Sequence, residues 1–288
     1  MKIFQKGFNY SQDGPGNRLI YHLQGCNMHC PWCANPEGLS FDGVLLLDEE
    51  WILESICPHH AIKGKDLDRS ICKACHGYEC IREHCTKGLR MSCFSMTPGE
   101  ILEEAIDNSP MFYDGGGVTF TGGEATAQYE ELARTLKLLK ENGIRTCIET
   151  NGTHPRLDAL MPLIDDLIMD CKLMDPDKHR KWTGLPIDTV KKNIRIAAGC
   201  HPHLHVRVPL IGGVNTCPGD IEAFISFFDE IKGDNVTFEA LLYHEYGRKK
   251  WKECGLDYKM NETTFVDDKV RPDFIRRIRA IGGNYQAT

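Results

Sequence analysis

The chain has 288 residues, of which 41% are hydrophobic and 26% are charged, as is usual for a folded soluble protein. Its 34 basic and 41 acidic side chains give a net charge of −7, which argues against a nucleic-acid-binding protein, because such proteins are usually basic. No apolar run reaches the ~18 residues of a membrane span, and the first residues do not resemble a signal peptide. We therefore expect a cytoplasmic protein.

The first predicted strand covers residues 18–23, and a Cys-, Gly- and Pro-rich segment without clear periodicity follows it to about residue 95. Beyond that segment, strands and helices alternate. Further strands are predicted at 117–121, 145–150, 166–172, 204–210 and 236–243. Helices are predicted at 129–142, 188–198, 220–232 and 272–281.

Six strands separated by helices predict a parallel α/β architecture with right-handed crossovers. Residues that carry chemistry follow the strands at their C-terminal ends, which is where (β/α) barrels build active sites. They are Cys26, Gly122–Glu124, Glu149–Asn151, Asp170–Lys172, Arg207 and His244. An open sheet would concentrate its site at one switch point instead. We therefore expect an α/β fold with an incomplete, TIM-like (β/α)6 barrel.

Cysteine is unusually frequent, with 14 residues, of which nine lie between Cys26 and Cys93. In a cytosolic chain of this length, such a count indicates metal or redox chemistry rather than disulfides. The other five are expected to be buried and to act as small hydrophobic residues. They are Cys147, Cys171, Cys200, Cys217 and Cys254.

Three cysteines stand close together after the first strand, in the spacing Cys26-x3-Cys30-x2-Cys33. Three thiolates can bind three irons of a [4Fe–4S] cluster and leave the fourth iron open for a substrate, whereas clusters are normally held by four cysteines. Zinc bound by these cysteines and His29 is an alternative, as is a loop without metal. We favour the cluster.

This loop resembles the CxxxCxxC signature of the radical S-adenosylmethionine (SAM) superfamily. Further segments resemble, in order, motifs of the glycyl-radical-enzyme activating enzymes within it. These are DGPGNR (13–18), GGGVTFTGGEA (115–125), ETNG (149–152), DCK (170–172) with His179 and Thr183–Gly184, RVPLIGGVN (207–215) and LLYHEYGRKKW (241–251). The resemblance covers essentially the whole chain. Ala125 stands where the family usually has proline.

The resemblance implies that the amino and carboxylate groups of SAM chelate the open iron, and that one electron then cleaves SAM to methionine and a 5′-deoxyadenosyl radical. It implies that Gly122 and Gly123 let the backbone approach SAM, that Glu124 accepts from its ammonium group, and that Lys172 lies near its carboxylate. The implied catalytic residues are Cys26, Cys30, Cys33 and Lys172. The implied SAM-binding residues are Trp32, Cys33, Ala34, Gly122, Gly123, Glu124, Asp170, Cys171, Lys172, Arg207 and His244.

Each of these assignments has a structural alternative. Trp32 could instead be a core residue at the mouth of the barrel, and the GGE segment could be an ordinary turn between a strand and a helix. Asp170 and Lys172 alternate on the predicted strand, share a face and suit an ion pair. Arg207 suits a salt bridge at a strand end, and His244 suits a packed position. A monovalent cation at Glu149 and Thr150, and a metal at His201, His203 and His205, stay open alternatives.

Residues 48–96 look like a degraded ferredoxin-type insert that divides a barrel domain of residues 1–47 and 97–288. In ferredoxins with two clusters, the fourth cysteine of each run binds the other cluster. Crossed ligation then predicts a second [4Fe–4S] cluster on Cys57, Cys72, Cys75 and Cys80. In alternative sets Cys85 replaces Cys57 or Cys80, and a further alternative is zinc.

The resemblance implies an enzyme that activates a glycyl radical enzyme: the adenosyl radical takes hydrogen from a backbone glycine of that partner. Asp13 and residues near His244 are candidates for contact with the partner's glycine loop. The second expected partner is a low-potential electron donor such as flavodoxin or ferredoxin. The alternatives are a radical SAM enzyme acting on a small molecule, and a non-catalytic iron–sulfur electron-transfer protein.

Overall fold

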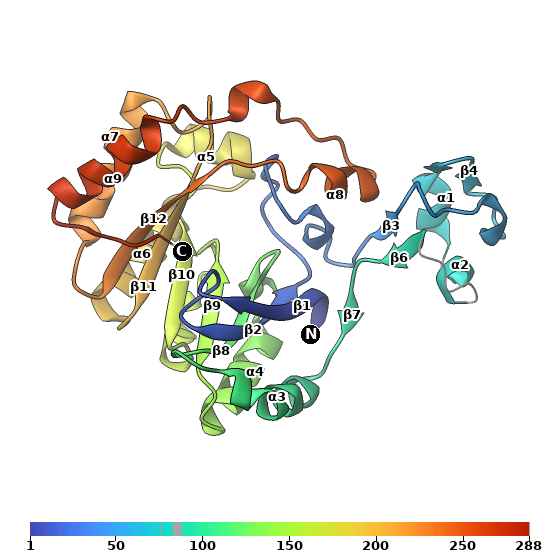
Figure 1. Ribbon diagram of the computed structural model, residues 1–288, viewed down its shortest axis with the longest axis horizontal. Helices are drawn as coiled ribbons and strands as arrows, with labels where there is room; N and C mark the ends of the chain where they lie inside the picture. The colour runs from blue at the N-terminus through green and yellow to red at the C-terminus, as the bar shows by residue number, and fades with distance from the viewer. Residues whose placement is uncertain (76, 83–87, 288) are drawn as a thin grey trace.

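The computed structural model describes residues 1–75, 77–82 and 88–287. Its main feature is a nine-stranded sheet with the order β13-β12-β11-β10-β9-β8-β2-β1-β7 (Figure 1). The strands are β1 (Lys2–Tyr10), β2 (Asn17–Leu23), β7 (Phe94–Ser95), β8 (Gly117–Gly122), β9 (Thr146–Thr150), β10 (Asp166–Asp170), β11 (Leu204–Leu210), β12 (Val236–Leu242) and β13 (Asn284–Tyr285). All neighbours from β2 to β13 are parallel, and β1 runs antiparallel to both β2 and β7.

The parallel strands follow one another in the sheet in the order of the chain, without the reversal that marks an open, doubly wound sheet. They are buried on both faces, as parallel sheets usually are: every residue of β8 except the last is buried. The parallel α/β architecture predicted from the sequence is therefore confirmed. All strand ends that carry the predicted site residues lie at one edge of this sheet.

Helices cover the outer face of the sheet (Figure 1). They are α3 (Pro98–Asp107), α4 (Tyr129–Glu141), α6 (Asp188–Cys200), α7 (Pro218–Ile231) and α9 (Val270–Ala280). Two further helices, α5 (Pro176–Thr183) and α8 (Arg248–Glu253), contact the loop that follows β2. Apolar faces at helical spacing pack onto the strands, as with the buried Leu132, Leu136 and Leu139 of α4. On the other side of the molecule, Phe228 of α7 stacks on Phe238 of β12 at 4.3 Å between ring centroids.

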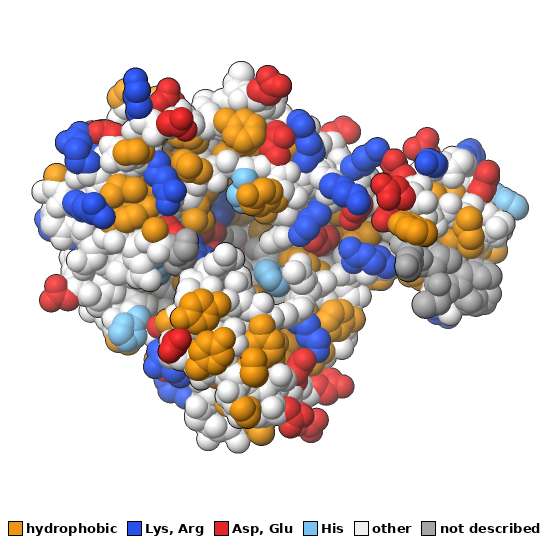
Figure 2. All heavy atoms as spheres, viewed as in Figure 1, with side chains coloured by type: hydrophobic (Ala, Val, Ile, Leu, Met, Phe, Trp, Pro, Cys, Tyr) orange, Lys and Arg blue, Asp and Glu red, His pale blue; other side chains and the backbone are white. Residues whose placement is uncertain are grey.

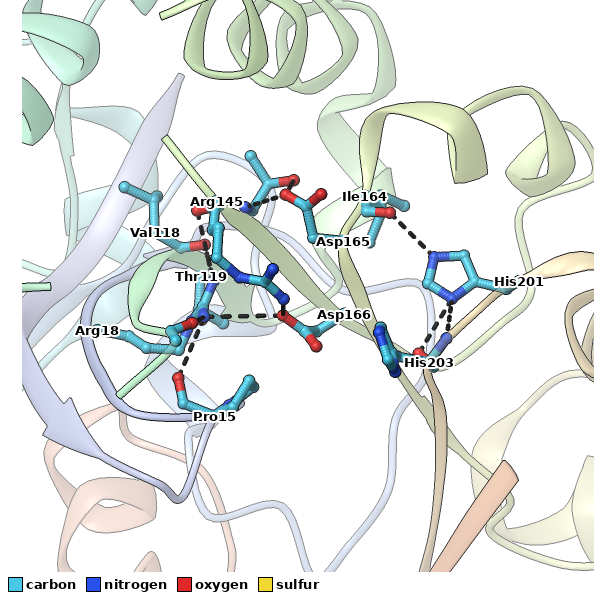
Figure 3. Close-up of polar contacts among 12 residues, drawn as sticks. Pro15, Arg18, Val118, Thr119, Arg145, Ile164, Asp165, Asp166, His201 and His203 are labelled. Atoms are coloured by element: carbon cyan, nitrogen blue, oxygen red, sulfur yellow. Dashed lines mark hydrogen bonds and ion pairs between the residues drawn. The ribbon is translucent and has the colours of Figure 1, made fainter. Parts of the chain in front are cut away.

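A buried arginine closes the N-terminal end of the parallel strands (Figure 3). Arg18 is fully buried, and its guanidinium donates to Thr119 Oγ1 at 2.7 Å and to the Val118 carbonyl at 2.9 Å. Asp166 Oδ2 lies 3.9 Å away. Gly16, in the same DGPGNR segment, has a φ of +69°, and a Cβ there would lie 2.3 Å from the Tyr113 carbonyl oxygen. Close packing thus explains both Gly16 and Arg18 of this motif.

The cysteine-rich insert protrudes from the main body (right in Figure 1). Just before it, β3 (Leu45–Leu47) pairs with β6 (Leu89–Met91) of the insert. The insert also contains β4 (Ile62–Lys63) paired with β5 (Asp66–Leu67), and the short helices α1 (Arg69–Ala74) and α2 (Glu79–Arg82). It has a small apolar cluster of its own, built on side chains such as Leu45, Ile56, Ile62 and Leu89. In the described part of the chain, no helix is long and apolar enough to cross a membrane.

Several sequence expectations need correction. The strand predicted at 166–172 ends at Asp170, so Asp170 and Lys172 do not share a strand. The strand β1 and the helices α3 and α5 were not predicted. Cys200 and Cys217 are exposed rather than buried. His201 lies outside the strand and contacts the carbonyls of His203 and Ile164 at 3.0 Å each, which leaves it no free nitrogen for a metal (Figure 3).

Candidate functional site

The three-cysteine loop follows β2 at the C-terminal edge of the sheet and is held from two sides. The backbone N–H of His29 donates to the carbonyl of Thr183, at the end of α5, at 3.0 Å. The indole N–H of Trp251, on α8, donates to the carbonyl of Cys33 at 2.8 Å. Gly247 is required beside this contact, because a Cβ there would lie 2.7 Å from the same carbonyl oxygen. The loop is thus fixed before any ligand binds.

The thiols of this loop keep their protons at neutral pH and would become thiolates only when a metal displaces the protons. Burial raises the pKa of Cys30 to about 12, although the Lys172 ammonium acts in the opposite direction. Burial raises the pKa of Cys26 and Cys33 as well. The backbone N–H groups of Met28 and Asn35 point at Cys26 Sγ and Cys33 Sγ, 3.4 Å away in both cases. Such contacts stabilise bound thiolates, and metal binding releases the protons.

A cavity of about 230 Å³ opens beside the cysteine loop, and a second cavity of about 530 Å³ shares part of its wall. Figure 2 shows the face of the molecule hollowed near its centre. Most predicted site residues line the first cavity: Cys26, Cys30, Trp32, Cys33, Ala34, Gly122, Gly123, Asp170, Lys172 and His244. Glu124, Arg207 and Asp13 line the second cavity. The structure therefore brings together residues from six strand ends that are far apart in sequence.

Cys171 is the exception among the predicted residues. Its side chain is fully buried in the main core, and its Sγ lies 3.4 Å from Met174 Sδ. Burial raises the pKa of its thiol to about 12, which keeps it neutral. Its side chain therefore packs into the core rather than facing either cavity.

Lys172 and Asp170 form an ion pair at the cavity wall, with 2.5 Å between Nζ and Oδ2. Lys172 reaches this position from the loop after β10, where Asn215 Nδ2 donates to its carbonyl at 2.8 Å. Burial alone lowers the pKa of Lys172, but the charges of Asp170 and Cys30 raise it overall. The ammonium therefore stays protonated and faces the cysteine loop.

Two glycines hold β8 against the cysteine loop. Gly122 has a φ of +117°, a conformation that favours glycine. At Gly123 a Cβ would lie 2.4 Å from the carbonyl oxygen of Gly25 and 2.5 Å from that of Gly38. Both positions require glycine because the backbone of β8 packs directly against the loop.

Glu124 is buried and already engaged by the chain itself. Its Oε1 accepts from Thr150 Oγ1 at 2.6 Å and from the backbone N–H of Thr126 at 2.9 Å. Its Oε2 accepts from the backbone N–H of Asn151 at 2.7 Å. Burial raises the pKa of Glu124, while these donors act against that shift. The carboxylate thus ties the end of β8 to the end of β9, and its contact with a SAM ammonium stays a prediction.

Arg207 forms the salt bridges that were its structural alternative. Its guanidinium pairs with Glu149 at 3.0 Å and with Glu239 at 2.9 Å, and it donates to the carbonyl of Gln12. Glu239 also lies 3.1 Å from His205. Burial lowers the pKa of Arg207, but the two carboxylates raise it overall. Through Gln12, this network fixes the loop between β1 and β2 at the cavity.

Sequence reasoning gave no role to several residues of the site. Tyr243 lines the first cavity, and its hydroxyl lies 2.7 Å from that of Tyr258. Lys250 pairs with the buried Glu37 at 2.7 Å. Trp251, described above, supports Cys33. Tyr243, Lys250 and Trp251 all belong to the LLYHEYGRKKW segment. The position of this segment at the end of the last long strand was the sequence signal that could have assigned them to the site.

The insert brings its four predicted ligands together. Cys57, Cys72, Cys75 and Cys80 line one small cavity. Burial raises the pKa of Cys72, and neighbouring thiols raise it further. Ala61 donates its backbone N–H to Cys57 Sγ at 3.3 Å. Cys85, the alternative ligand, lies outside the described residues.

A second set of potential ligands overlaps the insert cysteines. His59, Cys75 and Glu79 place their ligand atoms within 4.8 Å of one another.

Comparisons with known proteins identify the family of this chain. The family model of the Radical SAM superfamily matches residues 20–227. The chain is 30% identical over 273 residues to the 4-hydroxyphenylacetate decarboxylase activating enzyme of Clostridioides difficile (strain 630), covering 89% of this chain and 86% of that protein. It is 31% identical over 267 residues to the (2S)-3-sulfopropanediol dehydratase activating enzyme of Klebsiella oxytoca, covering 86% of this chain and 83% of that protein.

Solved structures show the same fold. A domain of the pyruvate-formate lyase-activating enzyme from Bacteroides vulgatus ATCC 8482 aligns with a TM-score of 0.50 and 26% identity, covering 60% of this chain and 98% of that domain. A radical SAM methyltransferase from Sphaerobacter thermophilus aligns with a TM-score of 0.57, covering 98% of this chain and 68% of that protein. The identity there is 14%, so this second likeness concerns the fold alone.

Proposed function

The chain belongs to the radical SAM superfamily and to its glycyl-radical-enzyme activating enzymes, and from this premise we propose which of its residues perform the reaction. The observation that carries the proposal is the meeting of the three thiols of the cysteine loop with the Lys172–Asp170 pair at one cavity wall. The thiols supply three ligands and leave one position of a cluster facing the cavity. The wall also carries apolar side chains such as Met28 and Ile211, and the polar side chains of Glu149, Asn151, Tyr243 and His244.

The residues present fit a [4Fe–4S] cluster with SAM. Cys26, Cys30 and Cys33 would hold the cluster, and the N–H groups at Cys26 and Cys33 are already directed at the sulfurs. When bound, the cluster would supply the electron that cleaves SAM, and the resulting radical would take hydrogen from glycine. The Lys172 ammonium offsets the negative charge of the thiolates and offers a donor to a carboxylate.

The remaining cavity residues would position SAM. We assign Gly122, Gly123 and Ala34 to close backbone approach, and Trp32 and His244 to flank the ligand. Glu124 and Arg207 would act chiefly by holding the loops, because each is bound to two or more partners of the chain. Asp170 would keep Lys172 directed at the cavity.

The partner's glycine loop would enter through the second cavity. Its walls combine Gln12 and Asp13 on one side with Leu241 and His244 on the other. Those segments belong to the β1–β2 loop and the end of β12, which stand at opposite ends of the parallel run of strands. We interpret the unclosed sheet between them as an incomplete (β/α)6 barrel whose gap admits a protein loop.

We further propose that the insert, residues 48–96, holds a second [4Fe–4S] cluster on Cys57, Cys72, Cys75 and Cys80. The shared small cavity and the N–H contact at Cys57 support this ligand set. The surrounding barrel, residues 1–47 and 97–288, would carry the SAM site. The whole chain would work in the cytoplasm, where thiols stay reduced, with a low-potential electron donor.

The test is anaerobic reconstitution with iron and sulfide, followed by reduction with dithionite, addition of SAM and mass spectrometry of 5′-deoxyadenosine. Cys30→Ser is the control. Product that depends on Cys30 supports the site. A protein that binds iron but forms no 5′-deoxyadenosine, even with a candidate glycyl radical enzyme present, would support the electron-transfer alternative.

A further inference from the structure

Three side chains of the insert bring three kinds of metal-ligating atom to one point. They are His59, Cys75 and Glu79, whose ligand atoms all lie within 4.8 Å of one another. Glu79 Oε2 lies 3.6 Å from His59 Nε2 and 3.7 Å from Cys75 Sγ. We call these residues the mixed set, because they offer one nitrogen, one sulfur and one oxygen. The proposed SAM reaction does not use His59 or Glu79.

The backbone beside two members of the mixed set is unusual. His59 lies in the turn before β4, and Glu79 is the first residue of α2 (Figure 1). The chain neighbours His60 and Tyr78 have φ values of +55° and +48°, which residues with a side chain rarely adopt. Gly77 leaves space for the carboxylate, since a Cβ there would lie 2.0 Å from Glu79 Oε1. These turns direct both ligands at the same point.

The spacing of the mixed set suits a single Zn²⁺ ion. Tetrahedral zinc binds sulfur at about 2.3 Å and nitrogen or oxygen at about 2.1 Å, so neighbouring ligand atoms lie about 3.4–3.6 Å apart. The two distances from Glu79 Oε2 are close to these values. The mixed set lines the small cavity of the insert, whose volume of about 10 Å³ has room for one ion or water molecule. The His59 side chain is 50% exposed, which gives an ion access from solvent.

The mixed set shares one thiol with the proposed second cluster, whose ligands would be Cys57, Cys72, Cys75 and Cys80. We propose that the mixed set binds one Zn²⁺ ion and that this ion competes with the second cluster for Cys75. The competition rests on the proposed function, whereas zinc binding does not. On binding, the Cys75 S–H bond breaks, a Zn–S bond forms and the proton leaves to solvent. A water molecule completes the tetrahedron, and nothing is oxidised or reduced.

The test uses the full chain with the changes Cys26→Ser, Cys30→Ser and Cys33→Ser, so that metal bound by closely spaced thiols reports on the insert alone. Anaerobic isothermal titration calorimetry measures the affinity for Zn²⁺ and the number of ions bound. Co²⁺ bound in place of Zn²⁺ reports the number of thiolate ligands through the intensity of its sulfur-to-metal charge-transfer absorption. Neither readout depends on SAM cleavage.

Two double variants are compared in this chain. His59→Asn/Glu79→Gln removes two ligands of the mixed set and leaves the four cysteines of the insert in place. The matched control, His60→Asn/Glu54→Gln, makes the same changes at two exposed neighbours that do not line the small cavity. Asparagine tolerates the left-handed conformation of residue 60, so the control keeps the local backbone.

We expect one tightly bound Zn²⁺ ion per chain and a Co²⁺ spectrum with a single thiolate ligand. The affinity for Zn²⁺ should fall at least about a hundredfold in the variant of His59 and Glu79, because two of three protein ligands are lost. The control should stay within about twofold of its parent. Unchanged affinity in the first variant overturns the mixed set. So does a Co²⁺ spectrum with four thiolates, since the ion would then sit on the cysteines alone.

Reconstitution of the same chains with iron and sulfide tests the competition. One equivalent of Zn²⁺ added first should lower the iron bound by the insert from about four atoms per chain to less than about one. The variant of His59 and Glu79 should still bind about four. Iron uptake that zinc does not reduce overturns the competition. A chain that binds zinc through the mixed set but takes up no iron without zinc contradicts the second cluster, and with it the competition, and supports the zinc site alone.

Discussion

The two cysteine-rich regions of this chain differ in what surrounds the sulfurs. The loop with Cys26, Cys30 and Cys33 is held by α5 and α8 and opens into a cavity of about 230 Å³ beside the half-buried Lys172–Asp170 pair. The insert holds its four cysteines around about 10 Å³ of space, on short strands and helices with an apolar cluster of their own. The difference teaches that only the first set of thiols has open space beside it that a substrate could occupy, whereas the insert offers its cysteines no comparable space.

The largest expected effect breaks the first region alone. Cys30→Ser should abolish 5′-deoxyadenosine formation, because the cluster loses one of only three protein ligands. Iron content should fall by about half, from about eight to about four atoms per chain, since the insert set remains intact. Iron analysis and mass spectrometry of the same sample check this. Retention of full SAM cleavage would contradict the assignment of the loop.

The matched change in the insert should also remove iron, but it should leave SAM cleavage largely intact. Cys57→Ser removes one of four ligands, so iron should again fall by about four atoms per chain. SAM cleavage driven by dithionite should stay within about threefold of wild type, because no described residue of the insert lines either cavity near the cysteine loop. Unchanged iron content would show that Cys57 is not a ligand and would favour a set that includes Cys85 or His59.

A smaller effect tests the buried network around Glu124 in the barrel. Glu124→Gln places an amide N–H₂ against the donors of Thr150, Thr126 or Asn151, so the free energy of unfolding should fall by about 2–3 kcal/mol. Chemical denaturation measures this. The exposed Glu130, paired with Arg156, supplies the control, and Glu130→Gln should change stability by less than about 1 kcal/mol. Equal effects at the two positions would contradict the role given to Glu124.

The smallest effects compare one helix cap in each region. Thr97 caps α3 on the barrel, and Asp68 caps α1, which carries Cys72. Each change to alanine should cost about 1 kcal/mol locally. Thr97→Ala should therefore lower the main unfolding transition, whereas Asp68→Ala should leave that transition in place and weaken iron retention in the insert. A main transition lowered equally by both changes would mean that the insert and barrel unfold together.

The sequence predicted the parallel fold well because its buried strands contain short apolar runs, as in LIY of β2 and LIM of β10. It did not predict α5, whose sequence PDKHRKWT has only His179 and Thr183 buried and so lacks an apolar stripe. The strand β1 was missed because four of its nine residues in a row are exposed, which breaks any alternation.

For the site, the strand-end positions were enough to gather the cavity residues. They could not show that Glu124 and Arg207 are bound by the chain itself, because those partners come from other strands. Likewise, nothing in the sequence ties Trp251 to Cys33 across 218 positions. Pairwise contacts of this kind depend on how the strands are placed in the sheet, and one sequence alone does not contain that information.

The contacts that Arg18 makes at the N-terminal end of the parallel strands can form only late during synthesis of the chain. Arg18 leaves the ribosome 101 positions before Thr119, its hydrogen-bond partner, so at about 5 to 20 residues per second its guanidinium stays without that partner for on the order of 5 to 20 seconds. The insert, by contrast, is complete once β6 has followed β3, before β8 is made. The nascent chain therefore presents Cys57, Cys72, Cys75 and Cys80 together while the barrel is still open.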